Sequence, residues 1–272
     1  MQVKAHTAPE PSIATAMLDD ALAHRPADGA PALLAISGLQ GSGKSTLAAA
    51  VVAAAQVRGL AAATLSLDDV YLTASQRQAL ARSVHPLLST RGPPGTHDLG
   101  LALRTLDAVA AGQPVRLPRF DKLADERLPE RDWPALTAPL DVLVFEGWCL
   151  GVPAEADAAL ATPLNDLERD EDPHAQWRRY CNTALARDYP SLWRRFQRLW
   201  LLQAPSFEVV SAWRWQQEQA MVAATSGRTS MDRDALARFL QHYERVSRQA
   251  LRTLPALADR VLLLDEARRV QA

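Results

Sequence analysis

Residues 38–45 read Gly38-Leu39-Gln40-Gly41-Ser42-Gly43-Lys44-Ser45 and match the pattern G-x-x-x-x-G-K-[ST] at every fixed position. The apolar residues 33–37 before them predict a short buried strand, and the alanine-rich residues 44–58 after them predict a helix that ends at Gly59. Glycines let such a loop wrap so closely that successive backbone N–H groups point at phosphate oxygens. The stretch therefore predicts a phosphate-binding loop, with a ligand-free glycine turn as the alternative.

The predicted helix after this loop supports the same conclusion, because a helix N-terminus favours a bound anion by about 0.3–1 kcal/mol. Lys44 is expected to bridge the terminal phosphates of a nucleotide, and the Ser45 hydroxyl is expected to ligate Mg²⁺. ATP and Mg²⁺ are therefore the predicted cofactors. The residues expected to touch the nucleotide are Gly38, Gln40, Gly41, Ser42, Gly43, Lys44, Ser45 and Thr46.

Four further apolar runs, at residues 61–67, 142–145, 199–202 and 261–264, predict the other strands of a sheet. The strand–loop–helix–strand order at residues 33–67 predicts a right-handed crossover, so the strands are expected to be parallel. The predicted fold class is α/β. It is a three-layer α/β/α domain of the P-loop NTPase type, with a mostly parallel five-stranded sheet and a helical elaboration.

Helices are predicted between and after these strands, at residues 98–111, 207–221 and 232–254. The first has Asp98 as its N-cap, and its predicted buried face consists of Leu99, Leu103, Leu106 and Ala110. For the domain organisation, we expect a partly helical N-terminal segment and one phosphate-loop domain with a helical insertion and a lid. Their ranges are 1–30 for the segment, 31–272 for the domain, about 153–198 for the insertion and about 205–230 for the lid.

Three carboxylates stand where predicted strands end: Asp68 and Asp69 after the second strand, and Glu146 after the third. Parallel strands present their C-terminal ends at one edge of the sheet, so these side chains are expected near the phosphate loop. A carboxylate there can ligate Mg²⁺ or accept the proton of a substrate hydroxyl. Glu146 is assigned to the metal and Asp68 to both roles. The alternative for the aspartate pair is an N-cap and first-turn acid of the next helix.

This sequence lacks the marker motifs of two other classes of phosphate-loop protein. The guanine-reading N-K-x-D of GTPases is absent, and so is the L-S-G-G-Q signature of ABC-type ATPases. Asp265-Glu266 imitates the end of a Walker B strand, but we interpret it as a turn after the last strand.

Composition excludes further functions. The chain has 272 residues, with 30 Lys and Arg against 31 Asp and Glu, so its net charge of −1 gives no basic field for nucleic acid. No apolar run approaches the roughly 20 residues that span a bilayer, and the N-terminus lacks the apolar core of a secretory signal. Cys149 and Cys181 lack metal-ligand spacing and are expected to be buried, reduced thiols. We expect a cytoplasmic protein that binds neither nucleic acid nor membrane.

Beyond the phosphate loop, the chain carries a series of motifs in a fixed order: SGLQGSGKST, SLDDVYLT, RGPPGTHDL, LPRFDK, VFEGW, NDLE, WRRYCN, APSF and WRWQQE. This series resembles the D-glycerate 3-kinase family of plants and fungi and its bacterial relatives. That family belongs to the larger group of phosphoribulokinase, uridine kinase and pantothenate kinase. The match runs from about residue 33 to residue 265, and its motifs are far more specific than the phosphate loop alone.

The resemblance implies roles for individual residues. Asp68 matches the carboxylate near the acceptor hydroxyl, and Lys44 and Arg214 are assigned to catalysis with it. Arg214 lies where such kinases place a lid helix, and an arginine there stabilises charge on the transferring phosphoryl group; Arg178 and Arg179 are weaker candidates. The residues assigned to the acceptor site are Asp69, Tyr71, Arg91, His97, Asp98, Arg119, Asp121 and Lys122.

For several of these acceptor-site residues, a purely structural role is the alternative. Asp98 is a good N-cap, His97 can be a hydrogen-bonding loop residue, and Asp121 with Lys122 can be a solvated ion pair. Phe120 stands where the plant enzymes have a tyrosine, and the segment after it differs from theirs, which leaves the acceptor open.

The charged residues are unevenly distributed along the chain. Residues 178–214 hold seven arginines and two acids, which predicts a basic helical face over the phosphates. Only three of the basic residues are lysines. Two of them, Lys44 and Lys122, lie inside motifs where a compact ammonium suits a crowded anion site.

The predicted function is transfer of the γ-phosphoryl group of ATP to a hydroxyl of a small anionic metabolite, with D-glycerate as the leading acceptor. A nucleoside or pantothenate-like acceptor is the nearer alternative, and a non-catalytic, nucleotide-dependent regulator is the more distant one. The only predicted partner is the small-molecule acceptor, and the chain is expected to be a monomer or a homodimer.

Overall fold

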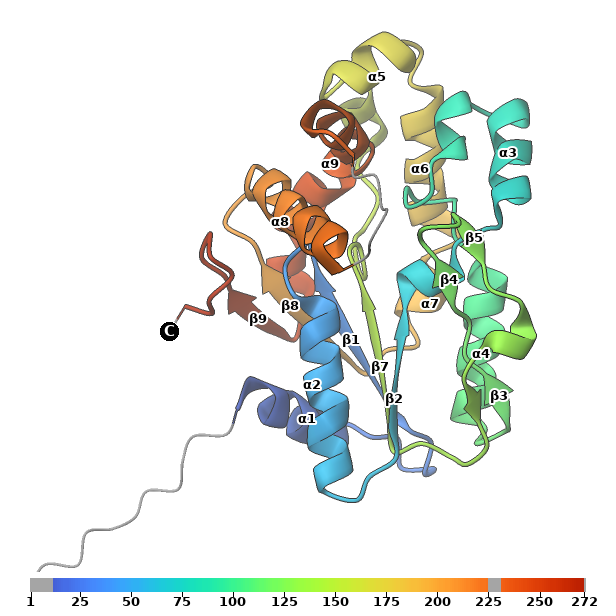
Figure 1. Ribbon diagram of the computed structural model, residues 1–272, viewed down its shortest axis with the longest axis vertical. Helices are drawn as coiled ribbons and strands as arrows, with labels where there is room; N and C mark the ends of the chain where they lie inside the picture. Colours follow the sequence, from blue (N-terminus) through green and yellow to red (C-terminus); the bar gives the residue numbers. More distant parts are fainter. Residues whose placement is uncertain (1–11, 225–230, 272) are drawn as a thin grey trace, which may run out of the picture.

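The computed structural model describes residues 12–224 and 231–271, and this part of the chain contains a five-stranded sheet (Figure 1). Neighbouring strands all pair in parallel, in the order β2-β7-β1-β8-β9. A strand lies at each of the five predicted positions, which confirms the α/β fold class. The strands are β1 (Ala32–Gly38), β2 (Ala62–Ser66), β7 (Val142–Gly147), β8 (Arg198–Gln203) and β9 (Arg260–Leu263).

The central strands β1 and β7 are buried at every residue, as expected where helices cover both faces of a parallel sheet. The helix after the phosphate loop, α2 (Lys44–Val57), packs on β1, β2 and β7, and α1 (Ile13–Ala23) packs beside α2. The long helix α9 (Arg233–Leu257) packs against β8. The residues that follow β1 and β7 are therefore held by the rigid centre of the fold.

The helix predicted at residues 98–111 is α4 (Leu99–Ala110), and Asp98 is its N-cap, accepting a hydrogen bond from the backbone N–H of Leu101 at 2.9 Å. The predicted buried face is wrong in part, since only Leu106 of its four residues is buried and the others are half-buried. Thr105 tolerates burial because its hydroxyl donates to the backbone oxygen of Leu101, which apolar periodicity does not register. The buried residues are Ala102, Thr105, Leu106 and Val109.

Three of the helices that follow β2 and β7 lie together beyond the carboxyl ends of the strands in Figure 1: α3 (Ala74–Ser83), α5 (Asp166–Glu171) and α6 (Gln176–Arg187). The region between β7 and β8 carries the predicted helices, η4 (Asp157–Leu160), α5 (Asp166–Glu171), α6 (Gln176–Arg187) and α7 (Pro190–Trp193). The region between β2 and β7 carries η1 (Leu67–Val70), α3 (Ala74–Ser83), η2 (Pro86–Ser89), α4, β3 (Val115–Arg116), β4 (Phe120–Asp121), β5 (Glu126–Arg127), η3 (Glu130–Asp132) and β6 (Ala135–Leu136).

After β8, the helix α8 (Val209–Ala224) lies in the range assigned to the lid. Residues 225–230 of that range, and residues 1–11 of the N-terminal segment, lie outside the described residues. Within the described ranges, we find no helix with the length and apolarity of a membrane span. Cys149 and Cys181 are buried free thiols, as predicted.

Candidate active site

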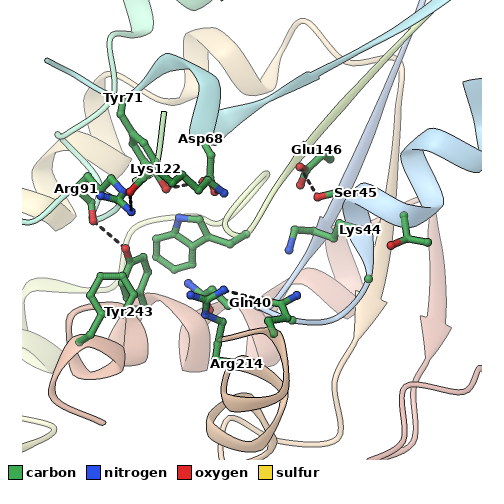
Figure 2. A pocket seen from close by; sticks show the side chains of 16 residues that line it. Gln40, Lys44, Ser45, Asp68, Tyr71, Arg91, Lys122, Glu146, Arg214 and Tyr243 are labelled. Carbon is green, nitrogen blue, oxygen red and sulfur yellow. Dashed lines mark hydrogen bonds and ion pairs between the residues drawn. The ribbon is translucent and has the colours of Figure 1, made fainter. Parts of the chain in front are cut away.

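A cavity of about 180 Å³ opens at the carboxyl edge of the sheet, where β1, β2 and β7 end. Figure 2 shows Lys44, Asp68, Lys122 and Arg214 around this space. Four cationic side chains and two carboxylates line it, so the cavity carries a net positive charge suited to an anionic ligand. The lining residues are Gln40, Gly41, Gly43, Lys44, Ser45, Thr46, Asp68, Tyr71, Arg91, Lys122, Glu146, Trp148, Arg214, Gln217, Phe239 and Tyr243.

The phosphate loop forms one wall of the cavity. Lys44 is buried, and its ammonium donates to the backbone oxygen of Leu39 at 3.0 Å. Burial lowers the pKa of Lys44 below its ordinary value, although the nearby Glu146 carboxylate opposes this. Among the residues that the structure describes, the buried amide of Gln40 has no hydrogen-bond partner, so it is available to a ligand. Of the eight predicted nucleotide contacts, Gly38 and Ser42 do not line the cavity.

Helix α8 presses directly on this loop. Gly41 has a φ of +81°, and a Cβ atom there would lie 2.7 Å from the Cβ of Trp213. Any side chain at position 41 would therefore push α8 away. The same helix carries Arg214, which donates to Gln217 at 2.7 Å and to Glu218 at 2.9 Å. The helix predicted to act as a lid thus holds its arginine in the cavity beside the loop.

The acidic residue at the end of β7 meets the first turn of α2. The Ser45 hydroxyl donates to a carboxylate oxygen of Glu146 at 2.8 Å. Their juxtaposition follows from the sheet, because β7 lies next to β1, which leads into the phosphate loop. Within the described ranges, no group of three His, Cys, Asp or Glu side chains could hold a metal. The serine–carboxylate pair still fits Mg²⁺, which commonly takes only one or two carboxylates and obtains its other ligands from phosphates and water.

Asp68 lies in η1, directly after β2, and both of its carboxylate oxygens accept hydrogen bonds. Oδ1 accepts from the Tyr71 hydroxyl at 2.5 Å, and Oδ2 accepts from the Lys122 ammonium at 2.5 Å. Burial alone would raise the pKa of Asp68, but Lys122 and Tyr71 outweigh it and hold that pKa well below its ordinary value. Asp68 is therefore ionised at neutral pH and faces the cavity.

The far wall of the cavity is built from segments distant in sequence. Arg91 forms an ion pair with Asp125, and its guanidinium lies 5.6 Å from the centre of the Phe120 ring. The hydroxyl of Tyr243, on α9, donates to the backbone oxygen of Arg91 at 2.8 Å. Gly92 makes room for this contact, since a Cβ atom there would lie 2.1 Å from that hydroxyl oxygen. Arg91 is thus held from both sides.

Of the eight residues assigned to the acceptor site, the structure brings Tyr71, Arg91 and Lys122 to the cavity and leaves five outside it. Asp69 accepts from the backbone N–H of Ser66 at 3.0 Å, in a capping box, which is the local alternative considered for it. It also pairs with Arg119 at 3.3 Å, so neither side chain is free for an acceptor. Burial raises the pKa of Asp69 to about 6, although Arg119 opposes it.

The other three residues outside the cavity also have structural partners. His97 is buried behind Tyr71 and forms a 2.5 Å hydrogen bond with the Tyr189 hydroxyl. Asp98 caps α4 and pairs with Arg127 at 3.1 Å. Asp121 accepts from the backbone N–H groups of Leu123 and Ala124 and closes the turn between β4 and β5.

The basic helical face predicted over the phosphates is wrong, because only Arg214 of the seven arginines lines the cavity. Arg178 is buried in an ion pair with Asp172, and Arg179 is partly exposed with its guanidinium 3.8 Å from Asp157. Arg198 lies at the start of β8, the opposite end from the cavity, where it pairs with Asp20 and Asp259. Asp265 pairs with Arg269 in a turn after β9, as interpreted from the sequence.

Four lining residues were not predicted: Trp148, Gln217, Phe239 and Tyr243. Trp148 lies in the VFEGW motif two residues after Glu146, and this position in the sequence could have identified it as a lining residue. Tyr243 has the helical spacing of a core residue, which hides its polar contact with Arg91. Asp125, which anchors Arg91, has no sequence pattern that would have selected it.

A parallel sheet with a phosphate loop after its central strand, and carboxylates after the two strands beside it, defines a P-loop nucleotide-binding protein. The family model described as phosphoribulokinase / uridine kinase matches residues 33–157. The chain is homologous to D-glycerate 3-kinase and belongs to the same family as the Schizosaccharomyces pombe kinase mug58.

Individual relatives support this assignment. The chain is 33% identical to the chloroplastic D-glycerate 3-kinase of Arabidopsis thaliana over 88% of its own length and 53% of that protein, so it spans about half of the plant relative. It is 31% identical to an uncharacterised kinase, mug58, of Schizosaccharomyces pombe, over 79% of each chain. The solved structure of a D-glycerate 3-kinase from Cryptococcus neoformans superposes with a TM-score of 0.74, at 25% identity over 95% of each chain.

Proposed function

We propose that this protein is an ATP-dependent kinase that phosphorylates a hydroxyl group of a small hydroxy acid, with D-glycerate as its substrate. The observation that carries the proposal is the position of Asp68. An ionised carboxylate faces the same cavity as the buried Lys44 of the phosphate loop, at the edge where three parallel strands end. A nucleotide-binding regulator without an acceptor needs no such carboxylate.

The chain's residues divide the work of phosphoryl transfer between them. The loop amides and Lys44 hold the phosphates of ATP, and Arg214 neutralises charge on the transferring group. Asp68 accepts the proton of the acceptor hydroxyl as the new O–P bond forms and the bond to the leaving ADP breaks. Catalysis in such a site comes mainly from positioning and electrostatics.

For Mg²⁺, we propose Ser45, Glu146 and Asp68 as the residues that hold it, directly or through water. When bound, the ion neutralises charge on the phosphate oxygens. Glu146, at the end of β7, orients the Ser45 hydroxyl, which lies in the first turn of α2. These are hard oxygen donors of the kind that Mg²⁺ selects.

The charge of the cavity supports an anionic acceptor. Lys44 and Arg214 belong to the phosphate side, while Arg91 and Lys122 lie on the opposite side with Tyr71. Two cations beside the proton acceptor suit a carboxylate on a carbon next to the reacting alcohol. D-glycerate has this arrangement, and two of the relatives are named for it.

The test is ADP release with ATP, Mg²⁺ and a panel of acceptors: D-glycerate, L-glycerate, uridine, pantothenate and no acceptor. We expect turnover with D-glycerate, and mass spectrometry should find phosphoglycerate as the product. Turnover with uridine or pantothenate but not with glycerate would contradict the proposed substrate. Nucleotide binding with no phosphorylated product from any acceptor would contradict the proposed activity.

We also propose the domain organisation, the cellular compartment and the oligomeric state of the protein. Residues 31–272 form one kinase domain in which the helices at about 153–198 are an insertion and residues 205–230 form the lid. The two buried free thiols suit a reducing compartment such as the cytoplasm. A monomer or homodimer without nucleic-acid or membrane partners stays a prediction, and light scattering of the purified protein measures its oligomeric state.

A further inference from the structure

Each oxygen of the carboxylate proposed to accept the proton already accepts one hydrogen bond in this structure. Tyr71 occupies Oδ1 of Asp68 and Lys122 occupies Oδ2, each at 2.5 Å (Figure 2). An acceptor hydroxyl that donates its proton to Asp68 must first form a hydrogen bond to one of these oxygens. Each carboxylate oxygen keeps a second lone pair, so the hydroxyl can bind beside a resident donor, but an ammonium on the same oxygen makes Asp68 a weaker proton acceptor. Departure of one donor therefore favours transfer.

The two donors differ in their freedom to leave. Tyr71 is 3% exposed, and its ring lies 4.9 Å from the ring of His97 and 5.2 Å from the ring of Phe120. The Lys122 side chain is 59% exposed and projects from the turn between β4 and β5. Rotation about its own side-chain bonds is enough to move the ammonium, so Lys122 is the donor that gives way.

The backbone at Lys122 stays in place during such a movement. Its carbonyl oxygen accepts a hydrogen bond from Arg91 at 3.2 Å. The same turn is tied down by Asp125, which pairs with Arg91 and with the buried Arg77. Lys122 is therefore a flexible cation on a fixed turn, and its reach remains within the cavity.

The cations of the cavity also differ in their partners. Arg91 pairs with Asp125, and Arg214 pairs with Glu218; neither acid lines the cavity. The carboxylate that pairs with Lys122 is Asp68 itself, which does line the cavity. An ammonium that leaves Asp68 requires another anion, because an unpaired charge beside a partly buried site is costly.

We propose that an anionic group on the acceptor replaces Asp68 as the partner of Lys122, and that this exchange frees Oδ2 of Asp68 to receive the hydroxyl proton. The inference rests on the proposed function and deepens it. An acceptor with a carboxylate next to its alcohol supplies both groups at once, one to Lys122 and one to Asp68. A neutral polyol or a water molecule supplies only the hydroxyl and meets a carboxylate that is still occupied.

This exchange makes Lys122 a specificity-determining residue in two senses. It binds the correct acceptor, and it hinders transfer to neutral acceptors and to water while no anionic acceptor is present. The blocking role separates the proposal from ordinary carboxylate binding. A lysine that only binds the acceptor contributes affinity for glycerate and has no effect on the reaction with glycerol or water.

The experiment compares wild type with Lys122→Met, which keeps an unbranched side chain of nearly the same length and removes its charge. Rates are measured at saturating ATP and Mg²⁺ with D-glycerate, with glycerol, and without acceptor. Glycerol replaces the carboxylate of glycerate by a neutral CH₂OH group. We expect kcat/KM for D-glycerate to fall about 10- to 100-fold, as for loss of a hydrogen bond to a charged group. Transfer to glycerol and ATP hydrolysis should rise about two- to fivefold, as for release of a partly exposed ion pair.

The matched control is Leu123→Ala, the next residue of the same exposed turn, whose side chain does not line the cavity. It should leave all three rates within error of wild type, and thermal unfolding checks that both variants are folded. If Lys122→Met loses glycerate activity with no rise in transfer to glycerol or to water, the blocking role is wrong. A wild-type enzyme that fails to phosphorylate D-glycerate would instead contradict the proposed function, so the two failures are distinct.

Discussion

The two sides of the cavity are built in different ways. The phosphate side comes from one continuous stretch, β1, the loop and the start of α2, which is fixed by backbone hydrogen bonds and by the buried core. The acceptor side comes from η1, the turn between β4 and β5, the loop at residues 89–98 and α9, which meet through side chains. Ion pairs of Asp68 and Asp125 hold that side together.

This difference separates the part of the site that must be rigid from the part that must exchange partners. Phosphate groups are common to all reactions of ATP, so a backbone cradle can be fixed in advance. The acceptor has to enter, displace a hydrogen-bond donor and leave as product. Side-chain ion pairs near the surface are weak enough to be exchanged, since an exposed pair contributes about 0–1 kcal/mol.

The substitution Asp68→Asn should give the largest difference between the effect on phosphoryl transfer and the effect on nucleotide binding. Asparagine keeps the shape of the side chain but accepts no proton at neutral pH, and loss of a general base costs about 10²- to 10⁴-fold in rate. Nucleotide binding should change little, which isothermal titration with a non-hydrolysable ATP analogue measures. A near-normal kcat would remove Asp68 as the proton acceptor, and lost nucleotide binding would mean that the two sides are not separate.

The reciprocal substitution on the phosphate side is Lys44→Met. It removes the ammonium that interacts with the phosphates and should lower kcat by about 10²- to 10³-fold, as for loss of one preorganised donor. Unlike Asp68→Asn, it should weaken nucleotide binding as well. Measuring both variants with the same acceptor tests the comparison directly, and unchanged nucleotide affinity in Lys44→Met would break it.

Acid should destabilise the protein through two buried histidines. Burial lowers the pKa of His97 and of His242 to about 4 in the folded state, below the ordinary 6.5. The unfolded chain therefore binds more protons between these values, so stability is complete above about pH 6.5 and falls as the pH drops toward 4. Between about pH 7.5 and pH 5, each histidine should lower the free energy of unfolding by about 2 kcal/mol.

Urea unfolding at several pH values measures this effect. His97 lies on the acceptor side, behind Tyr71, so His97→Gln should remove roughly half of the pH dependence that the pair causes. His242→Gln should remove the other half. If neither variant changes the slope of stability against pH, these histidines are not the groups that titrate.

The smallest expected effect concerns the anchoring of Arg91. Asp125→Asn removes the negative charge that pairs with Arg91, while asparagine tolerates the φ of +53° at this position. The KM for the acceptor should rise about tenfold, as for loss of one charged hydrogen bond, with the KM for ATP unchanged. Asp121→Asn in the same hairpin is the matched control, because within the described residues Asp121 accepts hydrogen bonds from the backbone of its own turn and does not line the cavity. An equal rise in the KM for ATP would contradict the separation of the two sides.

The same division explains which features could be predicted from sequence. The phosphate loop, the strands and the positions of Asp68 and Glu146 follow from local patterns and from the parallel order of the strands. The acceptor side does not, because Asp69 and Arg119 satisfy each other and Asp98 caps a helix, while Asp125 and Tyr243 anchor Arg91 from distant segments. A motif shows that a polar residue is present, and only the fold shows which partner it has.

The register of the central strand has a consequence for the synthesis of the protein. β1 pairs with β7, at residues 142–147, and with β8, at residues 198–203, and a Cβ atom at Gly38 would lie 2.9 Å from the Cβ of Leu202. On the ribosome, β1 therefore has no partner strand until β7 and β8 have been made, and pairing over such separations is slow. The nucleotide-binding loop is translated before both of these strands, so it acquires its final surroundings only after residues 198–203 have been made.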